Sequence, residues 1–169
     1  AYIADGHHRS AAAARYAKAH GFAGESRWFL GVIFPASQLK ILSYNRLVRD
    51  LKGLSAYEFL SRLSEKFTIG AKGARNCRMY FGGAWHDLSW DIPAGADVVA
   101  SLDVSYLQDN LLAPILGIGD PRTDARISFM GGVRGDAALA ANVDSGENAV
   151  AFAMEPVTVG EMMAIADAG

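Results

Sequence analysis

Strand-like and helix-like segments follow one another along this chain without strict alternation, and their order restricts the fold more than any single motif does. A doubly wound parallel sheet needs a helix after nearly every strand. The observed order therefore favours an α+β fold, or an α/β fold with a mixed sheet. A chain of 169 residues is long enough for a sizeable core, and we expect a single domain over residues 1–169.

The expected strands are rich in β-branched and aromatic residues and stop at glycine, proline or polar residues. They are residues 2–3, 27–34, 40–44, 78–81, 85–90, 98–104, 126–130 and 149–154. The run 27–34 (RWFLGVIF) is apolar on both faces, as in a strand that is buried on both sides. Gly82 and Gly83 separate two of these runs and predict a β-hairpin.

The expected helices are marked by an alanine-rich composition or by a capping box, in which a Ser or Thr precedes a Glu or Gln by three residues. They begin at Ser10, Ser55, Ser105, Asp136 and Thr158. The first ends near His20. Apolar residues at helical spacing follow Ser55, which predicts an amphipathic helix there.

Composition excludes several classes of protein. The chain is 51% hydrophobic and 20% charged with a net charge of −2, so no basic excess favours nucleic acid as a partner. No apolar run approaches the roughly 20 residues that span a membrane, so we expect no membrane partner. The single cysteine, Cys77, excludes an internal disulfide and indicates a cytoplasmic protein. Because the chain starts at Ala1 inside an expected strand and stops directly after a helical pattern, we expect a fragment cut at both ends.

The leading candidate site is a glycine turn at the start of the first expected helix. A helix N-terminus has free backbone N–H groups and partial positive charge, which favour phosphate or carboxylate. An arginine there adds a planar set of donors for either anion, and a histidine could transfer a proton near neutral pH. The residues of this candidate site are Asp5, Gly6, His7, His8, Arg9 and Ser10.

Simpler explanations of this turn remain open. The histidines could lie in a plain turn while Arg9 forms an ion pair with Asp5. Asp5 could act as a base, accept a substrate hydroxyl, or cap the helix. Adjacent histidines point in different directions and no H-x-x-x-H accompanies them, so we expect no metal site.

Two further groups of residues are secondary candidates. The group Asn45, Arg46, Arg49 and Asp50 closes an expected strand, where it could face a ligand or form a solvated surface, and Asn45 and Arg46 are its candidate ligand residues. The segment 131–135 (GGVRG) lies between an expected strand and an expected helix, but it lacks the lysine of a phosphate-binding P-loop. It therefore predicts a tight connection.

Four segments resemble successive blocks of the domain-of-unknown-function family numbered ten-fifteen: YIADGHHRSAAA, YNRLVRDL, LLAPILGI and AVAFAMEPVTVGEMMAIADAG. Members of that family are longer and have no settled activity. The D-G-H-H-R turn also resembles the signature of the ParB/sulfiredoxin-like superfamily, in which an arginine at a helix start holds nucleotide phosphate. The superfamily includes an ADP-dependent free-serine kinase and CTP-binding partition proteins.

The second resemblance implies a ParB/sulfiredoxin-like strand–turn–helix at the N-terminus, with phosphate held by His7, His8 and Arg9 and substrate near Asp5. The cysteine of sulfiredoxins has no counterpart, so sulfinic-acid reduction is not implied. We therefore expect a small-molecule phosphotransferase with ADP or ATP and Mg²⁺, in which Asp5, His7 and His8 are catalytic and residues 6–10 bind the nucleotide. The alternatives are a regulatory nucleotide-binding module without turnover, and an interaction domain in which the turn is structural.

Overall fold

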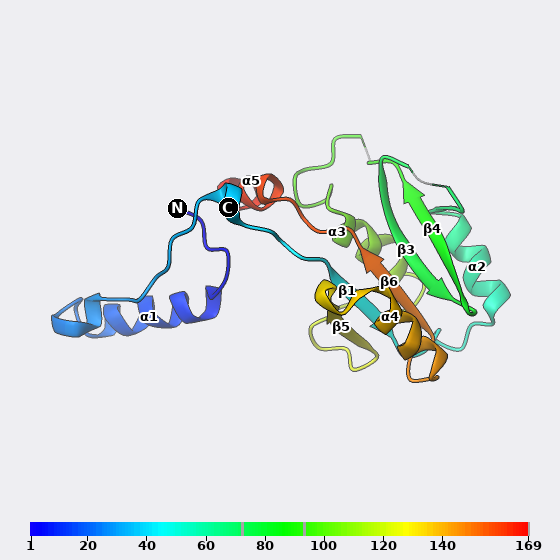
Figure 1. Cartoon of the computed structure of the whole chain (residues 1–169), viewed down its shortest axis with the longest axis horizontal. Coiled ribbons are helices and arrows are strands. Elements are labelled where there is room, and N and C mark those ends of the chain that lie inside the picture. The colour runs from blue at the N-terminus through cyan, green and yellow to red at the C-terminus, as the bar shows by residue number, and fades with distance from the viewer. Residues whose placement is uncertain (72, 93, 169) are drawn as a thin grey trace. The chain divides into compact units, whose positions relative to one another are not determined.

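The computed structural model describes residues 1–71, 73–92 and 94–168 (Figure 1). The described residues form two compact units, Ala1–Lys40 and Ile41–Ala168. We refer to them as the N-terminal unit and the C-terminal unit.

The N-terminal unit consists of one helix and extended chain. Helix α1 (His7–Ala19) is followed by two short 3₁₀ turns, η1 (Gly24–Arg27) and η2 (Ala36–Gln38). Helix α1 begins three residues before the predicted start at Ser10. Its C-terminus is closed by the N–H of His20, which donates to the carbonyls of Tyr16 and Ala17 at 3.2 Å.

The strands predicted at residues 2–3 and 27–34 are absent. Tyr2 and Ile3 are 41% and 47% exposed, and the large apolar side chains from Trp28 to Phe34 are 56–89% exposed. A strand needs a neighbour that pairs with its backbone N–H and C=O groups. No strand is described within Ala1–Lys40, so that unit offers these apolar runs no strand with which to form a sheet.

The C-terminal unit is built on a six-stranded sheet with the order β2-β4-β3-β6-β1-β5. Every neighbouring pair is antiparallel, so the fold is α+β. The strands are β1 (Tyr44–Val48), β2 (Thr68–Ile69), β3 (Arg75–Phe81), β4 (Ala84–Trp90), β5 (Ile127–Gly131) and β6 (Val150–Met154).

Within the C-terminal unit, four strand predictions are confirmed and two are wrong. Strands β3 and β4 form the predicted hairpin, in which Gly82 and Gly83 both have positive φ, as a tight two-residue turn requires. Strands β5 and β6 also lie where they were predicted. Strand β1 starts at Tyr44 instead of residue 40, because the polar-looking YNRLV segment pairs on both sides with β5 and β6. The strand predicted at 98–104 is instead a turn that leads into a helix.

The α-helices of this unit are α2 (Ala56–Ser64), α3 (Asp103–Leu107), α4 (Gly135–Asp144) and α5 (Val159–Ala168). Helix α3 continues into the π-helical stretch η3 (Gln108–Leu112), and the 3₁₀ turn η4 (Gly132–Arg134) precedes α4. The capping boxes at Ser55 and Thr158 are present: the Glu58 N–H donates to Ser55 Oγ at 3.3 Å, and the Glu161 N–H donates to Thr158 Oγ1 at 3.1 Å. The other two predicted caps are wrong. Helix α3 begins two residues before Ser105, and Asp136 lies within the first turn of α4.

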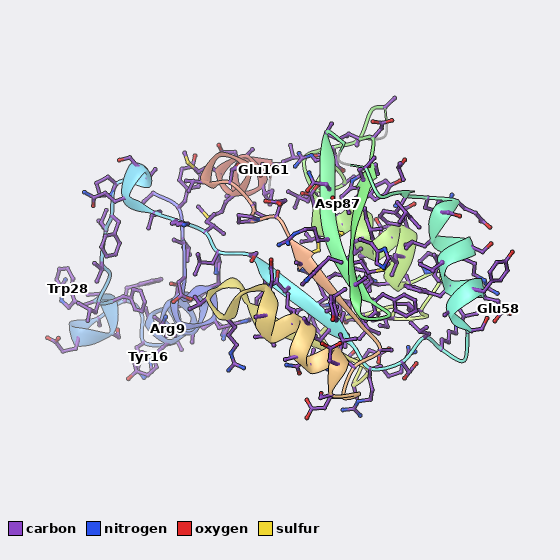
Figure 2. All side chains as sticks on the ribbon, turned by 45° about the vertical axis from the view of Figure 1, so that its right-hand side comes forward. Arg9, Tyr16, Trp28, Glu58, Asp87 and Glu161 are labelled. Atoms are coloured by element: carbon purple, nitrogen blue, oxygen red, sulfur yellow. The ribbon has the colours of Figure 1, made fainter. Side chains whose placement is uncertain are left out.

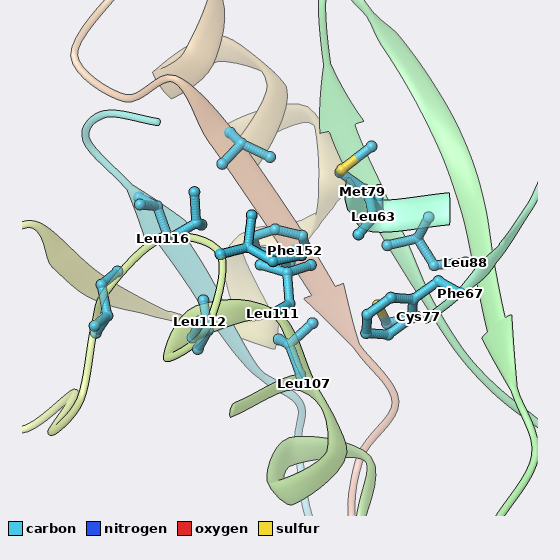
Figure 3. Packing of buried hydrophobic residues seen from close by; sticks show 14 of the residues in the cluster. Leu63, Phe67, Cys77, Met79, Leu88, Leu107, Leu111, Leu112, Leu116 and Phe152 are labelled. Carbon is cyan, nitrogen blue, oxygen red and sulfur yellow. The ribbon is translucent and has the colours of Figure 1, made fainter. Parts of the chain in front are cut away.

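Both faces of the sheet are covered in the C-terminal unit. The larger core cluster joins one face, including Val48, Met79 and Phe152, to helices α2 and α3 with η3 (Figure 3). The smaller cluster joins Leu139 of α4 to the opposite face. Strand β6 lies between β3 and β1, and all five of its residues are buried.

Candidate functional site

The turn before α1 depends on Gly6. This residue has φ 83° and is the N-cap of the helix, a conformation that a residue with a Cβ rarely adopts. A Cβ at this position would lie 3.2–3.4 Å from the guanidinium of Arg9. Glycine therefore lets the backbone turn sharply while the arginine side chain folds back over the turn.

The start of α1 presents backbone donors. The first intrahelical hydrogen bond runs from the N–H of Ser10 to the carbonyl of Gly6 at 2.8 Å. The N–H groups of His7, His8 and Arg9 precede it, and a helix has no acceptor of its own for these positions. The first turn contains no acidic side chain. Its partial positive charge is therefore not neutralised from within the helix.

The structure brings five of the six predicted residues together. A shallow concavity of about 360 Å³ is lined by Asp5, Gly6, His7, His8 and Arg9. The side chains of the two histidines and the arginine are exposed, and Figure 2 labels Arg9 on the first turn of α1. Ser10 is half-buried and does not line the concavity.

Asp5 is occupied by local contacts. Its Oδ1 accepts a hydrogen bond from the Gly6 N–H at 2.6 Å, and its Oδ2 lies 3.1 Å from Arg9 Nη2. Asp5 does not cap the helix, since no side chain does. Both members of the ion pair are largely exposed, at 93% and 75%, and such pairs contribute roughly 0–1 kcal/mol. A stronger anion could therefore displace Asp5 from Arg9 at little cost.

The secondary candidates Asn45 and Arg46 have different surroundings. Asn45 is buried, and its Oδ1 accepts a hydrogen bond from the Met154 N–H at 3.0 Å, which ties β1 to β6. Arg46 is half-buried and donates to the carbonyl of Tyr44. Its guanidinium lies 5.5 Å from the centre of the Phe129 ring.

A polar cluster that the sequence analysis did not find lies where β3, α3 and α5 begin. Arg75 donates from Nη1 and Nη2 to Glu161 Oε1, both at 3.0 Å, and its Nη1 lies 3.6 Å from Asp103 Oδ1. Asp103 Oδ1 is buried without a hydrogen bond among the described residues. Burial raises the pKa of Asp103 above its ordinary value despite the nearby arginine. The only sequence signal for this cluster was the capping box that contains Glu161.

Two other motifs have structural roles. Cys77 is buried in the main core, and burial raises the pKa of its thiol far above the usual range, which keeps it protonated and unreactive. Gly132 makes the tight connection predicted for residues 131–135, because its N–H donates to the Ser43 carbonyl at 2.8 Å. Within residues 1–71, 73–92 and 94–168, no group of three or more His, Cys, Asp or Glu side chains is arranged to hold a metal ion. No helix in the same residues is long and apolar enough to cross a membrane.

The sequence was compared with protein families, with curated proteins and with solved structures. The family described as "Protein of unknown function (DUF1015)" matches residues 1–105, which include the glycine turn, α1 and the sheet through β4. No curated protein matches the chain. No solved structure matches it either. Because the family match covers more than half of the sequence, the chain belongs to this family of proteins of unknown function.

Proposed function

We propose that the start of α1 binds the phosphate group of a nucleotide or of a phosphorylated small molecule, and that the protein is a small-molecule phosphotransferase. One observation carries the proposal: the exposed side chains of His7, His8 and Arg9 surround an open helix N-terminus whose backbone donors face no acidic residue of the first turn. Oriented N–H groups and an arginine fork suit a phosphate dianion.

In this proposal Arg9 exchanges Asp5 for the ligand. The guanidinium moves its donors to the phosphate, and the Asp5 carboxylate becomes free to accept a proton from a substrate hydroxyl. Either histidine could take that proton instead. Transfer would make a bond from the substrate oxygen to phosphorus and break the bond to the nucleotide leaving group, with ADP or ATP as donor and Mg²⁺ as the accompanying cation.

Calorimetric titration tests the binding step. The whole chain would be titrated with ADP, ATP, CTP, phosphoserine and inorganic phosphate, in parallel with Arg9→Ala and the control Arg15→Ala. Arg15 is an exposed arginine on the same helix, beyond the first turn. We expect saturable binding of at least one probe that is lost in Arg9→Ala and kept in Arg15→Ala. Equal binding by the two variants would refute the site. The site would also be refuted if none of the probes bound to the wild type.

A second variant tests the exchange of partners. Asp5→Asn removes the carboxylate that competes for Arg9 and keeps a side-chain oxygen for the Gly6 N–H. Affinity for phosphate should rise. An unchanged or lower affinity would show that Arg9 does not leave Asp5 for the ligand.

One observation favours a regulatory module over an enzyme: the carboxylate beside the histidines is already engaged by Gly6 and Arg9. Such a module would bind the nucleotide without turnover. Incubation with ADP or ATP, Mg²⁺ and serine, followed by detection of phosphoserine, separates the two functions. Saturable binding without any product would favour the module.

A further inference from the structure

Arg46 differs from the other half-buried arginines of the C-terminal unit. Arg75, Arg78 and Arg126 each have a carboxylate partner, at 3.0 Å (Glu161), 2.5 Å (Asp136) and 2.9 Å (Asp124). For Arg46 the described residues provide no such partner, and its one hydrogen bond goes to a neutral carbonyl. A guanidinium has five N–H donors, so most of its donor capacity is not used by that bond.

The groups around Arg46 do not neutralise its charge. Its electrostatic neighbours are the Tyr44 phenol and the Cys77 thiol, and the raised pKa of Cys77 keeps that thiol uncharged. Burial lowers the pKa of Arg46 from its ordinary value, which reflects the cost of holding a charge away from water. A half-buried cation without a counter-charge attracts an anion more strongly than an exposed one, because less solvent screens it.

An aromatic surface lies beside this cation. The rings of Tyr44 and Phe129 are stacked, with centres 4.9 Å apart and planes at 3°, and Arg46 lies over the Phe129 ring. Tyr44 is nevertheless 57% exposed. A ligand that reaches the guanidinium of Arg46 would therefore find a flat, accessible aromatic side chain close to it.

We infer that Arg46 and Tyr44 form a second oxyanion site, which takes the phosphate or carboxylate of a small molecule that also carries a planar group. Arg46 donates to the oxyanion, in two parallel hydrogen bonds where the geometry allows. Tyr44 supplies the contact for the planar group. The site uses residues of the C-terminal unit alone and does not depend on the proposed role of Arg9.

NMR of the arginine side chains tests this site directly in the whole chain. The Nε–Hε signals would be followed during titration with inorganic phosphate, phenyl phosphate, acetate and benzoate. The Arg46 signal would be assigned from its loss in Arg46→Lys. We expect a saturable shift of that signal, and tighter binding of phenyl phosphate than of phosphate and of benzoate than of acetate. If the two phosphates bind more tightly than the two carboxylates, the anionic group of the ligand is a phosphate. The opposite order identifies it as a carboxylate.

Arg49 provides the matched control, because it follows β1 directly, is exposed and has no ion pair among the described residues. Arg46→Ala should bind at least about tenfold more weakly than the wild type, a loss of about 1.4 kcal/mol, whereas Arg49→Ala should bind normally. If Arg46→Ala does not fold, the titration of the wild type, followed through the Arg46 signal, still tests the site. A shift of the Arg46 signal no larger than that of Arg49, or one that never saturates, would overturn the inference. Arg9→Ala should leave the Arg46 response intact, so this site and the site on α1 can fail independently.

Discussion

The Arg75–Glu161 contact joins the start of β3 to the first turn of α5, and it allows a quantitative test of the C-terminal unit. The two side chains are 86 residues apart in sequence and each is 25% exposed. Glu161, labelled in Figure 2, also accepts from the N–H and the hydroxyl of Thr158 through its other oxygen, both at 2.9 Å. One carboxylate therefore both closes the capping box and fixes the helix to the sheet.

Glu161→Gln removes the charge and keeps an oxygen for the cap. Exposed ion pairs contribute about 0.2–1 kcal/mol, while breaking a buried pair costs about 3–5 kcal/mol. The contact with Arg75 lies between these cases, so we expect the free energy of unfolding to fall by about 1.5 kcal/mol. Glu161→Ala also loses the cap, which adds about 1 kcal/mol.

Urea unfolding at neutral pH, followed by far-UV circular dichroism, measures these differences. Thr158→Ala is the matched control, since it removes the capping hydroxyl and leaves the ion pair. We expect it to cost about 1 kcal/mol, less than Glu161→Ala. Equal losses for Thr158→Ala and Glu161→Ala would show that the ion pair contributes nothing. So would a Glu161→Gln protein as stable as the wild type.

The same contact has a pH dependence of known sign. The backbone N–H of Thr158, with further hydrogen bonds from its hydroxyl and from Arg75, lowers the pKa of Glu161 below its ordinary 4.5. A group whose pKa is lowered on folding stabilises the protein above its unfolded pKa and loses that contribution as pH falls through its folded pKa. The stability difference between wild type and Glu161→Gln should therefore be present at neutral pH and shrink as pH falls below about 4.5.

Three further outcomes are expected. Burial raises the pKa of Asp103, so the contribution of this group to stability is complete below its ordinary pKa of 3.8 and is lost as pH rises through its pKa in the folded protein. Asp103→Asn should therefore be at least as stable as the wild type at neutral pH. A large loss of stability in urea unfolding would contradict this. Phe152 is fully buried on β6, and Phe152→Ala should cost about 3–5 kcal/mol in the same assay, with a loss under about 1 kcal/mol refuting its core position. Trp28 is 68% exposed, Trp85 is half-buried and Trp90 is 6% exposed, so Trp28→Phe should remove the largest share of the acrylamide-quenchable fluorescence. Unchanged quenching in this variant would show that Trp28 is buried.

Features that depend on neighbouring residues could be predicted from the sequence. The capping boxes at Ser55 and Thr158 are closed by side chains three residues away, and the β3–β4 hairpin is set by two glycines between aromatic runs. The turn from Asp5 to Arg9 is equally local, and the structure forms both the concavity and the alternative ion pair that the sequence allowed. Each of these depends on short-range geometry that the order of residues determines.

Features that depend on distant partners could not be predicted. The run Trp28–Phe34 has the composition of a buried strand, yet composition does not supply the neighbour that a strand requires. The start of β1 was misplaced because Asn45 and Arg46 look like surface residues, although one bonds Met154 and the other lies over Phe129. The contacts of Arg75 with Glu161 and Asp103 likewise join segments that only the folded sheet brings together.

The two arginines proposed to bind anions differ in their exposure to solvent, so their affinities for an anion should respond differently to salt concentration. Arg9 is 75% exposed, so its attraction for an anion acts through water and is screened by dissolved ions. Arg46 is half-buried, so solvent ions screen its charge less. Raising the ionic strength from about 0.05 to 0.5 M should therefore weaken Arg9-dependent binding of phosphate more than Arg46-dependent binding. The same salt dependence at both positions would mean that Arg46 meets its ligand in open solvent, and the argument from an uncompensated, half-buried charge would then fail.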